Sequence, residues 1–182
     1  DLSEVPSDGI LGEREVLAYL AAKGIADKGS DRPGDLPAGA TRVLVIGAGL
    51  GAMQVVDILL SDPSVEVAGC VDDDPALRDV RLFGVPVLGS VADLGRLWNE
   101  RRFEKAIVSV SHDVAIRRRL FEACKALGIP MANAIDPTSR IQRGAVLGEG
   151  NVLCAHCHVG VAAQLGDNNF LSAYNNVEHH NR

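Results

Sequence analysis

The stretch Ile135–Val177 carries a strict six-residue repeat that decides the fold of the C-terminal part of the chain. Written in sixes it reads IDPTSR-IQRGAV-LGEGNV-LCAHCH-VGVAAQ-LGDNNF-LSAYNN-V. The first position of every unit is aliphatic: Ile135, Ile141, Leu147, Leu153, Val159, Leu165, Leu171 and Val177. If aliphatic residues take roughly a quarter of all positions, eight in one phase arise by chance with a probability of about 10⁻⁵.

A period of six residues is typical of the hexapeptide β-helix. Three short strands make one triangular coil, the aliphatic side chain points inward, and each coil covers the core of its neighbour. We therefore expect residues 135–182 to form the first coils of a parallel β-helix. Eight repeats make fewer than three coils, so the β-helix is apparently truncated in this sequence.

The preceding block, residues 41–134, alternates strand and helix patterns. Strands are expected at 42–46, at 65–71 and within 103–110, and helices at about 52–60 and 113–127. Alternating strands and helices predict a parallel sheet with right-handed crossovers. With roughly 90 residues, the block holds only one mononucleotide-binding half of a Rossmann fold. The expected fold class is thus an α/β half-Rossmann domain followed by a β-helix.

Length and composition exclude several classes of protein. The chain has 182 residues, of which 47% are hydrophobic and 23% charged, as in soluble globular proteins. The net charge of −6 excludes non-specific nucleic-acid binding through a globally basic surface. No apolar run approaches the roughly 20 residues that span a bilayer, and the N-terminus lacks signal-peptide features. Residues 1–40 predict a helix at about 12–23 and a linker at 29–39. Four cysteines in a chain of this size predict reduced thiols in a cytoplasm.

A glycine turn follows the first expected strand of the α/β block. Gly47 and Gly49 let the backbone turn tightly and let a phosphate approach the N-terminus of the next helix. Asp72 ends the second strand, where a carboxylate can accept hydrogen bonds from a ribose or a base. The turn fits a nucleotide or nucleotide-sugar, NAD, or a strand-to-helix turn without a ligand.

Two further groups in the chain have both a functional and a structural interpretation. His112 follows the third strand, at the edge where parallel sheets bind ligands. The cluster Arg117–Arg119 is interpreted as a solvated helix face, with a phosphate or acidic partner as the alternative. The segment Cys154–His158 matches a haem-attachment or metal motif formally. In an extended repeat its side chains would point to opposite faces, so we expect no metal site there.

The sequence Glu178-His179-His180 is the candidate catalytic group of the β-helix. A histidine can take a proton from an amine or hydroxyl that attacks a thioester, and a neighbouring carboxylate would fix its tautomer. The structural alternative is a run of exposed polar residues near the end of the sequence. The position of these residues in register with the repeat favours the catalytic interpretation.

The two modules together resemble the bacterial nucleotide-sugar acetyltransferases of the sialic acid O-acetyltransferase and UDP-4-amino-sugar N-acetyltransferase type. The resemblance runs from about Arg42 to the C-terminus and leaves out residues 1–40. It rests on features in one order: Val45–Gly49, Val71–Pro75, Phe83–Gly89, a helix that ends in Leu-Gly, and Ile135–Ile141.

The resemblance implies a left-handed β-helix that forms a homotrimer and binds acetyl-CoA, as co-substrate, in the groove between neighbouring β-helices. It implies that the first module binds the nucleotide of a sugar, a UDP-amino sugar above all. The implied contacts are Gly47, Gly49, Asp72 and Asp73. It also implies that His179 is the general base and that a backbone N–H stabilises the oxyanion. No metal is implied.

Three positions depart from the family pattern. His180 stands where the family has Glu or Asp, Ser172 stands where relatives often carry Asn, and Leu50-Gly51 replaces Gly-His or Gly-Phe. These are the positions where the acceptor or the efficiency can differ. The sequence therefore predicts an acetyl-CoA-dependent acetyltransferase for nucleotide-linked sugars in surface-glycan synthesis. The alternatives are a nucleotide-binding regulatory or oligomerisation module without catalysis, and an NAD-dependent oxidoreductase.

Overall fold

The computed structural model describes residues 26–27 and 39–181. The expected helix at 12–23 and almost all of the expected linker lie outside these residues. The short strand β1 (Ala26–Asp27) pairs antiparallel with β4 (Arg81–Leu82), which pairs with β5 (Val85–Pro86). No helix in the described part of the chain is long and apolar enough to cross a membrane.

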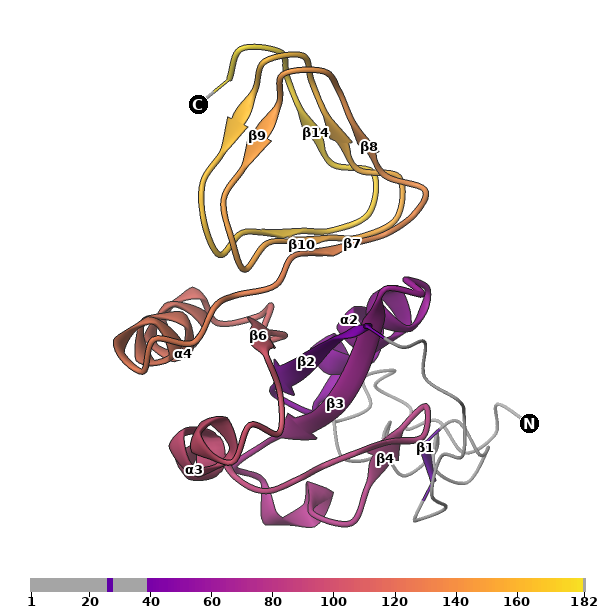
Figure 1. Ribbon diagram of the computed structural model, residues 1–182. Helices are drawn as coiled ribbons and strands as arrows, with labels where there is room; N and C mark the ends of the chain where they lie inside the picture. The colour runs from indigo at the N-terminus through magenta and orange to yellow at the C-terminus, as the bar shows by residue number, and fades with distance from the viewer. Residues whose placement is uncertain (1–25, 28–38, 182) are drawn as a thin grey trace, which may run out of the picture.

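A three-stranded parallel sheet forms the centre of the first module (Figure 1). Its strands are β2 (Thr41–Ile46), β3 (Val65–Val71) and β6 (Lys105–Val108), in the order β3-β2-β6. The three predicted strands and their parallel arrangement are confirmed. The chain crosses from one side of β2 to the other between β3 and β6, so the sheet has a topological switch point between β2 and β6.

Both faces of the sheet are buried, which explains why β2 is apolar without alternation. Val43 and Val45 face α2 (Leu50–Leu60), whereas Leu44 and Ile46 face α3 (Leu94–Asn99) and α4 (Val114–Ala126). The helices α2 and α4 confirm the two predicted ones, although α2 begins two residues before the expected Ala52. Further elements that no sequence pattern predicted are α3, β4, β5 and the 3-10 turns η2 (Pro75–Leu77) and η3 (Val91–Asp93).

The second module is a three-sided parallel β-helix. Each hexad contributes a two-residue strand that ends on the predicted aliphatic position: β7 (Ala134–Ile135), β8 (Arg140–Ile141), β9 (Val146–Leu147), β10 (Val152–Leu153), β11 (His158–Val159), β12 (Gln164–Leu165), β13 (Phe170–Leu171) and β14 (Asn176–Val177). The strands form three sheets, β13-β10-β7, β14-β11-β8 and β12-β9, in which paired residues lie one coil apart. The hexapeptide β-helix is confirmed.

The aliphatic positions form the core of the β-helix. Leu153 and Val159 have a strand on either side in their sheets and are fully buried. Ile135 and Ile141 lie in the first coil, which no coil precedes, and they remain 37% and 36% exposed. Burial therefore depends on stacking between coils, as expected for a solenoid.

The β-helix stands with its β7-β10 side against the first module (Figure 1). Ala134 and Val152 of this side belong to one hydrophobic cluster with Val55, Val56 and Leu59 of α2. The two modules therefore pack directly against each other through a shared hydrophobic cluster.

Candidate functional site

The glycine turn after β2 lies against the loop after β6. Gly47 has a left-handed φ of 101°, and a side chain there would come within 2.5 Å of the Ser109 hydroxyl. That hydroxyl is buried and lies 3.0 Å from the Ile46 carbonyl and 3.2 Å from the Gly47 carbonyl. Gly49 is the N-cap of α2 and supplies no side-chain cap, and the first turn of α2 holds no acidic residue. This helix end suits an anion.

Asp72 holds the glycine turn in place. One carboxylate oxygen accepts a hydrogen bond from the Ala48 N–H at 2.6 Å, and the other accepts from the Asp74 N–H at 2.8 Å. Asp72 is half-buried at the end of β3. The role that the structure gives this carboxylate is to connect two loops at the carboxyl edge of the sheet. Its predicted contact with a ligand stays a prediction.

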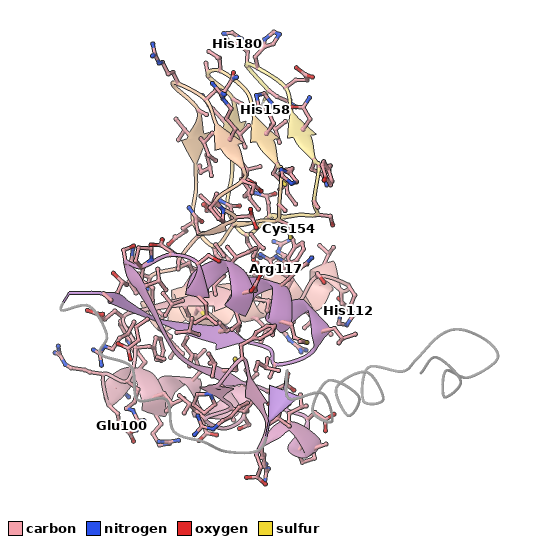
Figure 2. All side chains as sticks on the ribbon, turned by 90° about the vertical axis from the view of Figure 1, so that its right-hand side faces the viewer. Glu100, His112, Arg117, Cys154, His158 and His180 are labelled. Carbon is pink, nitrogen blue, oxygen red and sulfur yellow. The ribbon has the colours of Figure 1, made fainter. Side chains whose placement is uncertain are left out.

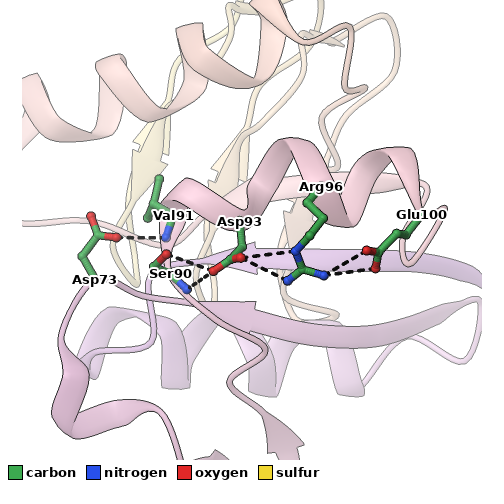
Figure 3. Close-up of polar contacts among 6 residues, drawn as sticks. All are labelled: Asp73, Ser90, Val91, Asp93, Arg96 and Glu100. Atoms are coloured by element: carbon green, nitrogen blue, oxygen red, sulfur yellow. Dashed lines mark hydrogen bonds and ion pairs between the residues drawn. The ribbon is translucent and has the colours of Figure 1, made fainter.

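Asp73 is tied to the start of the next helical segment (Figure 3). Its carboxylate accepts a hydrogen bond from the Val91 N–H at 2.9 Å. Beside it, Ser90 and Asp93 form a reciprocal capping box, and Arg96 bridges Asp93 and Glu100. The pKa of the Asp93 carboxyl is lowered, above all by the hydrogen bond that the Ser90 N–H donates to it. This network holds the loop that carries Asp73 in a defined position.

Leu50 and His112 complete the predicted nucleotide site from two sides. Leu50 is the first residue of α2 and is 40% exposed. His112 is exposed in the loop after β6, just before Asp113 caps α4 by accepting from the Ile116 N–H (Figure 2). The predicted residues of the first module thus come from three loops at the carboxyl edge of one sheet, around its switch point. Parallel α/β sheets bind ligands at this place.

Replacing Asp72 with asparagine is expected to weaken nucleotide binding about tenfold and to destabilise the fold by about 1–2 kcal/mol. An amide keeps one acceptor oxygen and loses the other, so either the Ala48 or the Asp74 N–H loses its partner. Titration calorimetry with UDP and GDP and urea unfolding measure the two effects. Asp79→Asn is the matched control, because Asp79 is an exposed carboxylate outside these loops. Equal nucleotide affinities and equal free energies of unfolding in the two variants would contradict the role of Asp72.

The predicted catalytic residues lie at one corner of the β-helix, directly after β14. His179 Nδ1 lies 3.0 Å from His180 Nδ1, with the rings edge to face. Glu178 instead accepts a hydrogen bond from the Asn176 amide at 2.6 Å. The His179 Nδ1, which a neighbouring carboxylate was expected to hold, contacts His180 Nδ1, and Glu178 Oε1 is engaged by Asn176. All three predicted residues are exposed.

The segment Cys154–His158 does not run straight, contrary to the extended backbone expected for it. Residues 155–156 form a corner turn with His156 at a left-handed φ of 60°. Cys154 Sγ then contacts Gln54 of α2, Cys157 Sγ contacts the Ser172 carbonyl, and the His156 ring stacks on Tyr174. Burial raises the pKa of the Cys154 thiol to about 11. Nowhere among residues 39–181 do three His, Cys, Asp or Glu side chains gather as metal ligands.

Arg117 does not lie on the solvated helix face predicted for it. The expected solvated face holds for Arg118 and Arg119, but Arg117 is only 4% exposed. All five N–H groups of its guanidinium donate to backbone carbonyls, those of Val108, Val110, Gly150, Asn168 and Asn169. Burial lowers its pKa to about 10, so the group remains charged at neutral pH. Arg117 joins the loop after β6 to the β-helix.

The first module matches the family model described as the PglD N-terminal domain over residues 42–124. Among curated proteins, none matches this chain. Solved structures with a similar fold include PerB from Caulobacter crescentus in complex with CoA and GDP-perosamine, with 28% identity and a TM-score of 0.68. That comparison covers 80% of this chain and 66% of PerB.

A second similar structure is the acetyltransferase domain of PglB from Neisseria gonorrhoeae in complex with acetyl coenzyme A. It shows 26% identity and a TM-score of 0.69, over 78% of this chain and 66% of that one. A variant of the Caulobacter GDP-perosamine N-acetyltransferase, with one histidine replaced by alanine, is 27% identical. This chain spans a little under two thirds of the length of these relatives.

The fold, the order of the modules and the comparisons agree on the class, which is a parallel-sheet α/β domain followed by a hexapeptide β-helix. The resemblance to the bacterial nucleotide-sugar acetyltransferases of the hexapeptide β-helix family is confirmed, with a PglD-type domain in the N-terminal place.

Proposed function

We propose that this chain is the acceptor-binding and base-carrying part of an acetyltransferase that moves an acetyl group from acetyl-CoA to a nucleotide-linked sugar. The single observation that carries the proposal is the pairing of two features in one chain. A glycine turn and a helix N-terminus whose N-cap, Gly49, supplies no side-chain cap lie at the switch point of a parallel sheet, and an exposed imidazole, His179, lies at a corner of a β-helix.

The nucleotide is expected at the carboxyl edge of the sheet. Its phosphates would approach Gly47, Gly49 and the start of α2, where backbone N–H groups and the helix dipole favour negative charge. Leu50, Asp73 and His112 would line the mouth of this site, and Asp72 would hold the glycine turn in place through its hydrogen bond from the Ala48 N–H. The GDP-perosamine bound by PerB supports a nucleotide-sugar as the ligand class.

The chemistry needs one proton acceptor. The sugar amine or hydroxyl attacks the thioester carbonyl of acetyl-CoA and loses its proton to His179 Nε2. A C–N or C–O bond forms, the C–S bond breaks, and the leaving thiolate of CoA takes the proton that His179 holds, which returns the imidazole to its neutral form. The result is an acetylated sugar and free CoA. The acetyl coenzyme A bound by the PglB domain supports this donor.

A homotrimer would bring the two sites together. Figure 2 places His112 on the first module and His180 on the side of the β-helix that faces away from the first module. A nucleotide-sugar held at the sheet edge therefore cannot easily reach His179 of the same chain. Val146 and Val161 lie on the outer surface of the β-helix and are 60% and 44% exposed, which supports contacts between β-helices of neighbouring copies.

The test is acetyl transfer by the complete protein. We expect one nucleotide-linked amino sugar, in a panel of UDP- and GDP-sugars, to gain one acetyl group by mass spectrometry, with CoA released in equal amount. Light scattering should report a trimer. Binding of a nucleotide without acetylation of any acceptor or binding of CoA would instead favour the regulatory module. A response to NAD would favour the oxidoreductase.

A further inference from the structure

The corner that carries His179 and His180 is held by the preceding coil. His180 has a left-handed φ of 58°, like Ala162 one coil earlier at 56°. The His180 N–H donates to the Val161 carbonyl at 3.0 Å. The backbone of His180 is therefore fixed at a structural corner, and its ring is presented edge to face to the ring of His179, with centroids 5.2 Å apart.

Glu178 belongs to a different hydrogen-bonded chain. The Asn176 side chain donates its N–H to Glu178 Oε1, and its Oδ1 lies 2.7 Å from His158 Nδ1. An amide oxygen only accepts, so His158 Nδ1 carries the proton of that bond. The chain His158–Asn176–Glu178 thus directs the carboxylate along the β14 side. The ring nitrogen that faces His179 Nδ1 is that of His180.

Two Nδ1 atoms at 3.0 Å share one proton, because one must donate and the other accept. A base that works through Nε2 needs a bare Nε2, so His179 must hold its proton on Nδ1 and donate it to His180. His180 then carries its own proton on Nε2. When His179 takes the proton of the acceptor, it becomes a cation and the same hydrogen bond becomes charge-assisted.

We propose that His180 is the positioning residue of the general base: its Nδ1 holds His179 in the tautomer and orientation that leave Nε2 free. This inference rests on the proposed function, in which His179 is the base. It assigns to an imidazole the place in which the related pattern has a carboxylate, and it removes Glu178 from that role. Donation to a neutral ring keeps the pair uncharged before the proton is transferred.

The variants His180→Ala and His180→Asn separate this role from a structural one. Alanine removes the acceptor, so His179 populates both tautomers and rotates freely, and we expect kcat to fall about tenfold with KM values within about twofold. Asparagine places Oδ1 close to the position of the imidazole Nδ1 and tolerates a left-handed φ, so it is expected to restore most of kcat. The acetyl-transfer assay of the complete protein measures both.

The matched controls are His156→Ala and His156→Asn. His156 is an exposed histidine at another left-handed corner of the same β-helix, with φ of 60°, and its ring stacks on Tyr174. These variants carry the conformational cost of the corner without the change at the base, and wild-type kcat is expected. If His180→Ala keeps wild-type kcat, or if His180→Asn is as slow as His180→Ala, the inference is wrong.

A second measurement does not depend on turnover. Long-range ¹H–¹⁵N spectra of labelled histidine report the tautomer, and we expect His179 to carry its proton on Nδ1 in the wild type and a mixture in His180→Ala. An Nε2-protonated His179 in the wild type would overturn the inference. Full activity of His179→Ala would overturn the proposed base itself. An inactive His179→Ala beside a fully active His180→Ala would overturn only the role of His180.

Discussion

Replacing His179 with alanine is expected to lower kcat for acetyl transfer by about 10²–10⁴-fold, the range that a positioned general base contributes. Methyl in place of imidazole leaves the attacking amine or hydroxyl without a proton acceptor at the corner after β14. The KM for the nucleotide-sugar should change little, because the nucleotide is expected to bind at the sheet edge of the first module. Release of the CoA thiol, followed with a thiol reagent, measures kcat.

The same variant should fold normally. The His179 side chain is exposed, and its ring contacts only the neighbouring His180 among the ring pairs of the described chain. Removing it is therefore expected to change the free energy of unfolding by no more than about 0.5 kcal/mol. His156→Ala again serves as the control for a lost corner histidine. An unchanged kcat in His179→Ala, or an equal loss in the control, would remove His179 as the base.

The second large effect concerns stability. Replacing Arg117 with methionine is expected to destabilise the protein by about 3–5 kcal/mol, as removal of a buried, fully hydrogen-bonded charge does. Methionine matches much of the volume of the side chain but leaves five carbonyls without their donors, and their dipoles were arranged around a cation. Urea unfolding, with the slope of the transition as a check on two-state behaviour, measures the loss.

Lysine at position 117 is expected to recover only part of this stability. An ammonium has three donors on a compact centre, whereas the guanidinium presents five in a planar fork. Arg118→Met is the matched control, because Arg118 is exposed and forms an ion pair with Glu122 one helical turn away. Such a solvent-exposed pair contributes little to stability. A loss in Arg117→Met no larger than in Arg118→Met would contradict the structural role.

The hexads were predictable because their information is local and repeated. Every aliphatic position from Ile135 to Val177 reports the same inward direction, so an error at one hexad is corrected by the next. The same holds for β2 and β3, whose apolar runs Val43–Ile46 and Val67–Val71 indicate burial on both faces. The periodic parts of the fold were therefore predictable from sequence alone.

Arg117 was not predicted because all its partners are backbone carbonyls, which leave no trace in residue types, and three of them, at Gly150, Asn168 and Asn169, are distant in the sequence. One signal was available. Arg117, Leu120 and Cys124 are the buried residues of α4, at the spacing of one helical face. Three consecutive arginines point about 100° apart on a helix. Among them, only position 117 has the spacing that puts it on the same face as Leu120 and Cys124.

The sequence predicted which loops lie together at the candidate site, but not the hydrogen bonds between their residues. The three loops around Gly47, Asp72 and His112 follow from the rule that parallel strands end at one edge. That Asp72 accepts from Ala48, and that Glu178 accepts from Asn176, depends on rotamers and on loop paths that no pattern encodes. The pairing of His179 with His180 belongs to the same class of detail.

Because paired residues of the β-helix lie one coil apart, the number of residues in each strand fixes the orientation of every later side chain. Deleting one residue from a strand such as β10 would turn every later inward side chain toward another direction, and the two terminal imidazoles would leave their corner. Extra residues can be accommodated as loops at the corners, and whole coils can be inserted between others without reorienting the later coils. Length variation in proteins of this architecture is therefore expected at corners and in steps of complete turns of the solenoid.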